Sequence, residues 1–571
     1  MSYFVSQKNN GLSMVSYVGD SAVLLAFDLD QEKTANLAGF SIRCITPSKG
    51  QYQTNDYFLQ NLLNFNDQIT GNTSQVSIKP VGSDKAPFQQ FHWMHFPSAG
   101  PGQYQYIAYA SYFNSNGSVQ LGPSVTANFD LEYKSFPNLE VGFTRGDISS
   151  QAYSDRFSNA PIRPAQKSID FDTTPFQNQY QWLGAHARKL VFDFLNECQQ
   201  DPSINLDVFV FDFDEPDIIN SLCKLGSRVR VLQDDAPLHM GPNAMEPQAT
   251  TKLQAAGVAV KKGHFNRFAH DKIMIQTRNG SAVKVLTGSA NFSIRGLYVQ
   301  ANSVLVFDDP VVASLYEQAF QTAFALDFSN PGPATRQFAT SAIGSKWNDI
   351  NENDSNLPPL SVSFAPHGQV PAGQSTFSIE KISQAIQSAK SSILFAVMQM
   401  SGGGDAMSAL LNLGNRTDLL SLGIIQNEGQ LQLFKPGNTA AFTSFDFLSK
   451  NIPEPFKSEW GGGAGEVIHH KFVVCDFNGA SPIVFCGSSN LSAGGEAENG
   501  DNLIAIYDKK IAIYYAVEAI RLFDHYQFRR LHQQSTSDKP LMLDSTDNWA
   551  KPFYDPQNIK SLQRQVLSSP T

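Results

Sequence analysis

Two 24-residue segments of this 571-residue chain align with each other without a gap. They are HDKIMIQTRNGSAVKVLTGSANFS (residues 270–293) and HHKFVVCDFNGASPIVFCGSSNLS (residues 469–492), and nine of their positions are identical. In both, a lysine lies two residues after the first histidine, a Gly-Ser pair begins 18 residues after it, and an asparagine lies 21 residues after it. A duplication that keeps polar residues at fixed spacing predicts two copies of one structural unit, 199 residues apart, that share one chemical task.

The spacing also predicts the local structure of each copy. A histidine and a lysine two residues apart on a strand point to the same face. Asn279-Gly280 and Asn478-Gly479 are strong signals for a tight hairpin turn. The strand that returns from each turn would bring Gly-Ser-x-Asn back beside the histidine and the lysine. Each copy is therefore expected to place an imidazole, an ammonium and an amide together at one end of a hairpin.

The rest of the chain divides by pattern. The aromatic segment 104–113, the turn at Asn114–Gly117 and the alternating run after it are typical of paired strands, which predicts an all-β sandwich. After this region a strand at 206–212, a helix from Pro216 and a strand at 228–232 indicate α/β structure with a mostly parallel sheet. The predicted divisions are an accessory domain (1–140), a first lobe (141–335), a linker (336–359), a second lobe (360–535) and a C-terminal tail (536–571).

Composition and charge narrow the class of protein. The five cysteines form no CxxC pair, which favours buried thiols in a reducing compartment over a disulfide framework. The N-terminus lacks a signal-peptide pattern and no apolar run reaches the length of a membrane helix, so we expect a cytoplasmic protein without a transmembrane segment, or one exported without a signal. The net charge of −10 argues weakly against broad polyanion binding, although residues 251–275 hold five basic residues against one acid.

Each copy of the repeat resembles the His-x-Lys-x4-Asp motif, followed by Gly-Ser-x-Asn, of the phospholipase D superfamily. The resemblance covers roughly residues 141–535. It implies a two-lobed α/β fold, with mixed sheets flanked by helices and a pseudo-twofold arrangement, added to the N-terminal all-β sandwich. It also implies that both motifs meet in one site and that catalysis uses a covalent phosphohistidine, with no metal and no other cofactor.

The residue types suit phosphodiester chemistry. Lys272 and Lys471 can neutralise the phosphate, and Asn291 and Asn490 can donate hydrogen bonds to its oxygens. One imidazole attacks phosphorus and the other protonates the leaving oxygen. Of the remaining candidates, two serines are expected to add donors near the substrate, and two arginines beside the first motif either bind phosphate or pair with a surface acid: Ser289, Ser488, Arg267 and Arg295.

The two copies differ in their acids. The second copy keeps the motif aspartate as Asp476, where the first has Thr277. Asn499-Gly-Asp-Asn502 resembles a family element in which an acid, here Asp501, orients the motif histidine; its counterpart, taken as Val299–Asn302, has no carboxylate. This asymmetry favours His469 as the nucleophile and His270 as the acid.

Three functions stay open on this pattern. A phospholipid substrate, hydrolysed or transphosphatidylated, is slightly favoured by the acidic net charge and would imply peripheral contact with a membrane. A nucleic acid would fit the basic stretch before His270, and a binding or scaffold protein of the same fold would explain the weaker first copy. A monomer suffices for a complete site in every case. The acidic run 212–217 reads as a helix cap or solvated loop rather than a cation site, and the Gly-rich run 460–465 as a loop at the mouth of the site.

Overall fold

The computed structural model describes residues 3–49, 54–73, 79–146, 150–242, 244–350, 355–371, 375–398, 403–427, 430–434, 441–444 and 467–570. The Gly-rich run 460–465 lies outside these ranges. Across the described part of the chain, no helix combines the length and the apolar composition that crossing a bilayer requires.

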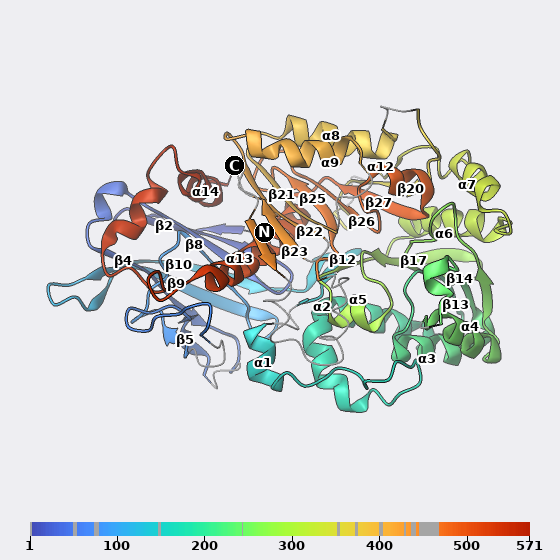
Figure 1. The fold of residues 1–571 in the computed structure, drawn as a ribbon, viewed down its shortest axis with the longest axis horizontal. Coiled ribbons are helices and arrows are strands. Elements are labelled where there is room, and N and C mark those ends of the chain that lie inside the picture. Colours follow the sequence, from blue (N-terminus) through green and yellow to red (C-terminus); the bar gives the residue numbers. More distant parts are fainter. Residues whose placement is uncertain are drawn as a thin grey trace.

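The N-terminal region is built on two four-stranded antiparallel sheets packed face to face, as predicted, and it also holds a two-stranded sheet of β6 (Gln60–Asn61) and β7 (Val81–Gly82) (Figure 1). Met14 and its neighbours lie in the core between the sheets, whereas the alternate residue Val15 packs against the core of the lobes. The first sheet is therefore buried on both faces, which fixes this domain to the rest of the molecule. The strand orders are β1 (Tyr3–Val5), β2 (Leu12–Val18), β3 (Val23–Leu29), β8 (His92–His95); and β10 (Val119–Leu131), β9 (Gly102–Phe113), β4 (Leu37–Ile45), β5 (Asp56–Phe58).

Each lobe is built on one large mixed sheet, of eight strands in the first lobe and nine in the second, and the two strand orders correspond except at one edge. The expectation of mostly parallel sheets is wrong, because each repeated motif is itself an antiparallel hairpin at the centre of its sheet. The first sheet runs β11 (Lys134–Phe136), β12 (Leu139–Phe143), β18 (Ser303–Phe307), β17 (Ser281–Gly288), β16 (Ile273–Arg278), β13 (Ile204–Val210), β14 (Val229–Gln233), β15 (Ala259–Lys262). The second runs β19 (Asn348–Ile350), β20 (Leu360–Ala365), β27 (Asp501–Ile506), β26 (Ile483–Gly487), β25 (Lys471–Cys475), β21 (Ser392–Met398), β22 (Leu420–Asn427), β23 (Gln430–Phe434), β24 (Ala441–Ser444).

Helices cover the two sheets. On the second sheet, alternate residues of β21 pack against α8 (Phe377–Ser388) and α9 (Asp405–Leu411) on one face, and join the core that holds α13 (Lys509–Gln534) on the other. Figure 1 shows this lobe beside the first lobe, with the N-terminal strands at the opposite end of the molecule. The first lobe carries α2 (Gln177–Gln200), α3 (Pro216–Leu225), α4 (Glu246–Ala255), α5 (Ile294–Tyr298) and α6 (Pro310–Ala325).

The duplication extends to the helix starts. Ser293 caps α5 by accepting a hydrogen bond from the backbone N–H of Gly296, and Ser492 caps α12 (Ala493–Glu498) in the same way from Gly495. Asp309 and Asp508, again 199 residues apart, cap α6 and α13. The structural repeat is thus longer than the 24 residues that align by identity.

Two predicted boundaries are corrected. The segment taken as a linker holds the end of α7 (Pro331–Ala339) and strand β19, which pairs with β20, so part of it belongs to the second lobe. The segment taken as a tail forms the 3-10 turn Asp547–Phe553 and α14 (Ile559–Ser568), and it packs on the N-terminal domain. Apolar residues in that segment explain the packing, since Ala550 and Phe553 lie in the core of the sandwich.

One predicted turn is also corrected. Asn279 and Gly280 adopt positive φ angles of 53° and 79° and close β16 onto β17, as expected for a tight turn. The second hairpin instead pairs Cys475 with Ile483 across a longer connection. Asp476 takes the left-handed conformation there, at φ 53°, and Pro482 cannot donate to the ladder.

Candidate active site

Reciprocal backbone hydrogen bonds join the two motifs. The N–H of His270 donates to the carbonyl of Gly500 (2.8 Å), and the N–H of His469 donates to the carbonyl of Ala301 (3.1 Å). Ala301 and Gly500 are themselves 199 residues apart, so the two contacts are related by the pseudo-twofold symmetry of the repeat. The structure therefore brings both motifs together where the lobes meet, as predicted.

His270 is paired with the only carboxylate of the orienting element. Its Nδ1 lies 2.6 Å from Asp501 Oδ1, and both side chains are buried. A carboxylate that accepts from Nδ1–H leaves Nε2 with its lone pair facing the site. Burial raises the pKa of Asp501 to about 7, which Lys272 opposes.

His469 is held by neutral acceptors instead. Its Nδ1 lies 2.9 Å from Asn302 Oδ1 and 3.1 Å from the carbonyl oxygen of Ser289. Both acceptors fix the same tautomer, with the proton on Nδ1 and the lone pair on Nε2. The expectation that Asp501 lies beside His469 is wrong, because the orienting residue of each lobe reaches across to the histidine of the other lobe.

A one-residue shift in alignment hid the counterpart of Asp501. At the constant spacing of 199, Asp501 corresponds to Asn302, and not to the residue before it. The hydrogen bonds agree, since Ser289 Oγ donates to Asn302 Oδ1 (2.8 Å) and Ser488 Oγ donates to Asp501 Oδ1 (3.0 Å). The first copy has thus exchanged a carboxylate for an amide of the same shape, and extending the gapless alignment would have found it.

The two motif lysines are buried beside their histidines, and each contacts a different kind of side chain. Lys272 Nζ donates to the carbonyl of His270 and lies 4.8 Å from the centre of the Phe211 ring. Lys471 Nζ donates to the carbonyl of His469 (2.8 Å) and lies 3.8 Å from Met398 Sδ. Burial lowers the pKa of Lys272 to about 8 and, with the lysines, holds the pKa of both histidines well below the usual value.

The two motif asparagines each keep an unused acceptor. The Oδ1 atoms of Asn291 and Asn490 are buried and have no hydrogen-bond partner among the described residues. Asn291 Nδ2 donates to Asp212 Oδ2 at 2.6 Å. The amide orientation of Asn291 follows from this contact, because a carboxylate can only accept.

The hydroxyls of the two serines contact the residues that orient the histidines. Ser289 and Ser488 are fully buried, and their hydroxyls hold the orienting residues described above. Ser488 Oγ also contacts Asp271 Oδ1 (3.1 Å), which accepts from Asn502 Nδ2 at 2.7 Å. Both hydroxyls thus support the residues that orient the histidines, and their contact with a substrate stays a prediction.

Asp476 lies away from the histidines, at the opposite end of β25 from Lys471. Its carboxylate accepts from the backbone N–H groups of Lys390 (3.0 Å), Ser391 (2.7 Å) and Ser392 (3.1 Å). The catalytic role predicted for Asp476 is wrong, because the strand carries it about 16 Å along the sheet from the motif lysine. Its role is to anchor the start of β21.

The two arginines differ in their position relative to the site. Arg295, on α5, is partly buried and its charge acts on both Asp212 and His469, which places it at the site. Arg267 is exposed, with its guanidinium 5.6 Å from the centre of the Phe268 ring. Phosphate binding by Arg295 stays a prediction. Within the described part of the chain, the Arg267 guanidinium makes no hydrogen bond with a motif side chain.

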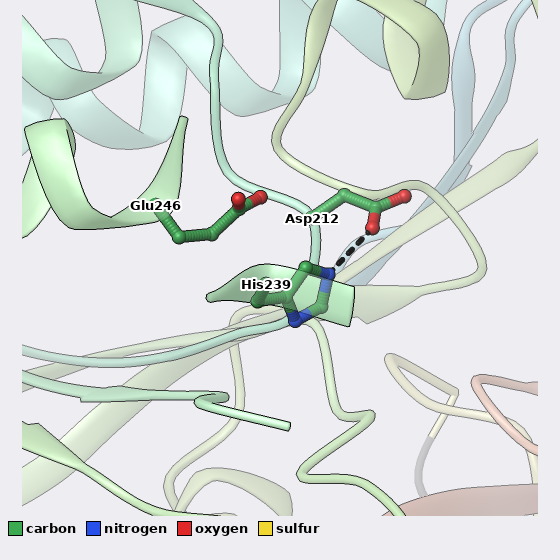
Figure 2. Close-up of side chains that lie close together, drawn as sticks. All are labelled: Asp212, His239 and Glu246. Carbon is green, nitrogen blue, oxygen red and sulfur yellow. Dashed lines mark hydrogen bonds and ion pairs between the residues drawn. The ribbon is translucent and has the colours of Figure 1, made fainter. Parts of the chain in front are cut away.

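An Asp-His-Asp relay that the sequence did not predict lies at the edge of the site. His239 Nδ1 lies 2.7 Å from Asp234 Oδ1, and its Nε2 lies 3.0 Å from Asp212 Oδ1 (Figure 2). Burial opposes the charge of His239, but the two carboxylates raise its pKa to about 9. No local spacing signals this relay, because its members come from three separate segments.

The acidic run 212–217 mostly caps and anchors, as predicted. Glu215 caps α3 by accepting from the N–H of Ile218 (2.6 Å), and Asp214 accepts from the N–H of Ile294 (2.8 Å). Asp217 accepts from Thr173 Oγ1 at 2.8 Å. Asp212 is the exception, since it faces the site.

Both lobes of the chain are similar to known proteins. The family model described as "Cardiolipin synthase, PLD-like domain" matches residues 191–324 and 382–523, once in each lobe. The mitochondrial cardiolipin hydrolases of Xenopus tropicalis and Xenopus laevis are each 28% identical over 120 residues, which is 20% of this chain and 53% of theirs. The chain thus spans about half the length of these curated relatives.

Solved structures that match parts of the chain include Nuc from Salmonella typhimurium and a phosphatidylserine synthase from Haemophilus influenzae. Nuc is 22% identical, with a TM-score of 0.20, over 24% of this chain and 84% of Nuc. The synthase is 12% identical, with a TM-score of 0.38, over 66% of this chain and 94% of the synthase.

The two segments that the family model matches lie one in each lobe. Each match contains one His-x-Lys motif with its Gly-Ser-x-Asn strand, and the structure joins both motifs in one buried cluster. The chain therefore belongs to the phospholipase D superfamily, whose members are phosphodiesterases and related hydrolases.

Proposed function

We propose that this protein is a metal-independent phosphodiesterase that forms a covalent phosphohistidine on His270. The observation that carries the proposal is the contact of 2.6 Å between His270 Nδ1 and the Asp501 carboxylate, set against the amide that holds His469. Phosphorylation of an imidazole leaves it cationic, and a carboxylate stabilises that cation better than an amide does. This assignment reverses the one that the sequence favoured.

The proposed reaction has two displacements. His270 Nε2 forms a bond to phosphorus, the bond from phosphorus to the leaving oxygen breaks, and a protonated His469 gives its Nε2 proton to that oxygen. Water then attacks phosphorus and loses a proton to His469 as the phosphorus–nitrogen bond breaks. Both histidines return to their starting states, and a phosphomonoester leaves.

The surrounding charges suit these steps. Lys272 and Lys471 would neutralise the phosphate oxygens, and the asparagine amides would donate to them. The bound phosphate anion would offset the two lysines and so raise the pKa of His469, which must carry a proton to act as the acid. An amide partner keeps that imidazolium acidic, which suits proton donation.

We infer that the substrate is a phospholipid. The net charge is −10, and two cations of the basic stretch are already engaged: Lys252 pairs with Asp170, and Lys261 donates to the carbonyls of Phe324 and Leu326. These contacts weaken the case for a nucleic-acid strand along this stretch. The relatives' names, cardiolipin hydrolase and cardiolipin synthase domain, support a lipid.

The direct test compares substrates in the presence of EDTA. Vesicles of cardiolipin and of phosphatidylcholine, single-stranded DNA, duplex DNA and RNA are offered side by side, and release of phosphomonoester or alcohol is measured. We expect lipid turnover that EDTA does not change. Faster cleavage of a nucleic acid would replace the proposed substrate, and loss of turnover with EDTA would overturn the metal-independent mechanism.

A further inference from the structure

The turn after β12 contacts a residue of the candidate active site. Thr144 follows β12 directly and is buried. Its Oγ1 accepts from the backbone N–H of Asn302 (2.8 Å) and donates to the carbonyl of Gln300 (2.7 Å). Its own N–H donates to the carbonyl of Asn302 at 3.0 Å. One threonine therefore fixes both backbone groups of Asn302, the residue whose side chain holds His469.

The second lobe holds its orienting residue in a different way. Asp501 is the first residue of β27 and pairs with Ala365 of β20 in the regular ladder of the sheet. Asn302 instead precedes β18, and its N–H is bonded to a side-chain hydroxyl. A hydroxyl is placed by the backbone that carries it, so the position of Asn302 depends on what holds the turn at Thr144.

An acid of the N-terminal domain holds this turn. Asp20 lies in the turn between β2 and β3, and its Oδ2 accepts from the N–H of Phe143, the last residue of β12, at 2.9 Å. Strand β11 pairs with β12 at Leu139 and Glu140, so the carboxylate takes the place of a neighbouring strand at the far end of β12. Asp20 is 2% exposed, and a charge is buried at such a place only where other groups compensate it.

His186 of α2 compensates the charge of Asp20. Its Nδ1 donates to Asp20 Oδ1, and the ring of Tyr133 stacks on the imidazole with 4.6 Å between the ring centres. Burial opposes a charge on His186, but the carboxylate of Asp20 raises its pKa. Asp20 is therefore a fixed and ion-paired acceptor, which suits it to hold a backbone group in place.

Helix α2 is interrupted beside this ion pair. Ala185 has φ 45° and ψ −136°, a conformation that is unfavourable for a residue with a side chain. The carbonyls of Trp182 and Leu183, just before it, accept from the Nε and the backbone N–H of Arg145, both at 2.8 Å. Such backbone persists where its surroundings fix it, and it is frequent near functional sites. The interruption lets one helix hold Arg145 and, through His186, the N-terminal domain.

We propose that Asp20 and Thr144 are positioning residues for His469, and that the N-terminal domain thereby completes the active site. Both act through Asn302, which fixes the tautomer and the direction of the imidazole. The inference rests on the proposed function, in which His469 gives a proton to the leaving oxygen. An imidazole that is slightly displaced would transfer this proton poorly, because proton transfer requires hydrogen-bond distance and alignment.

Two phosphodiesters whose leaving groups differ in basicity test the proposal on the full-length protein. Bis(p-nitrophenyl) phosphate loses p-nitrophenoxide without a proton, whereas the more basic phenoxide of diphenyl phosphate needs one. For each ester kcat/KM reports formation of the phosphoenzyme, and the ratio of the two values does not depend on the folded fraction of a variant. We expect Thr144→Val and Asp20→Ala each to raise the ratio of p-nitrophenyl to phenyl ester about tenfold. Thr144→Ser keeps the hydroxyl and should keep the wild-type ratio.

Asp524→Asn is the matched control. Asp524 of α13 contacts His92 Nε2 of β8 at 2.9 Å across the same interface between the N-terminal domain and the lobes, in a contact that does not involve Thr144. This variant should keep the wild-type ratio. Equal losses on both esters in Thr144→Val would overturn the positioning role, and so would a ratio that Asp524→Asn raises as much. Hydrolysis of neither ester by the wild-type protein, nor of the lipids above, would instead overturn the proposed function and the inference with it.

Discussion

The two halves of the active site share one spacing and differ in one functional group. The first lobe presents Asn302 to His469, and the second lobe presents Asp501 to His270, from positions 199 residues apart. Oxygen and nitrogen differ little in size, so the exchange leaves the geometry of both halves alike. It changes the charge beside each imidazole, so two halves with the same spacing can take different roles.

The largest effects should come from the histidines themselves. His270→Ala and His469→Ala should each lower kcat/KM on a lipid by about 10⁴-fold or more, because the two act as a unit. On bis(p-nitrophenyl) phosphate, whose leaving group needs no acid, His469→Ala should still release one p-nitrophenol per protein in a burst and then stall. A burst from His270→Ala instead would reverse the assignment, and mapping the phosphorylated histidine checks it independently.

Exchanging the orienting groups should have the next largest effect. Asp501→Asn should lower kcat about 100-fold, since it removes the charge that stabilises the phosphorylated His270. Asn302→Asp is the matched reciprocal change, and we expect a much smaller loss. Similar losses in both variants would show that the two halves do not differ in role.

The same pair gives a pH dependence. Burial raises the pKa of Asp501 to about 7, and the proposed role needs its ionised form, so the rate of phosphoenzyme formation should fall as the pH drops below about 7. Asp501→Asn should remove this limb from the kcat profile. Asp271, which shares Ser488 with Asp501, also has a pKa raised to about 7 by burial, so Asp271→Asn is the control that separates the two carboxyls.

The motif aspartate, Asp476, should matter for stability and little for catalysis. Asp476→Ala should lower the free energy of unfolding by about 2–3 kcal/mol, because three backbone N–H groups lose a charged acceptor. Urea unfolding measures the loss, and kcat of the folded fraction should stay near the wild-type value. A loss of kcat comparable to that of Asp501→Asn would return Asp476 to the site.

The smallest expected effect concerns the relay. Because the folded-state pKa of His239 is raised to about 9 from 6.5, its contribution to stability is complete below about pH 6.5 and is lost as the pH rises through about 9. Thermal unfolding at pH 7 and pH 10 should show a drop of about 1–3 kcal/mol in the wild-type protein. His239→Gln should be less stable at pH 7 and lose less on going to pH 10.

The sequence predicted the units of this molecule better than their contacts. The motif hairpins, the α/β lobes and the N-terminal sandwich follow from local spacing and alternation, so the amino-acid pattern alone predicts them. The pairing of Asp501 with His270 could not be predicted in this way, because it depends on how two lobes sit against each other. The pairing of Asp212 with His239 lies within one lobe, but 27 residues separate the two and no local spacing signals the contact.

The reciprocal backbone hydrogen bonds from His270 to Gly500 and from His469 to Ala301 place the candidate active site at the interface between the lobes. Neither half of the chain holds its own histidine fully in place, and each lends the other a main-chain carbonyl and an orienting side chain. Chemical competence is therefore a property of lobe association rather than of either fold. We therefore expect a substitution that separates the lobes to lower turnover even where each lobe stays folded.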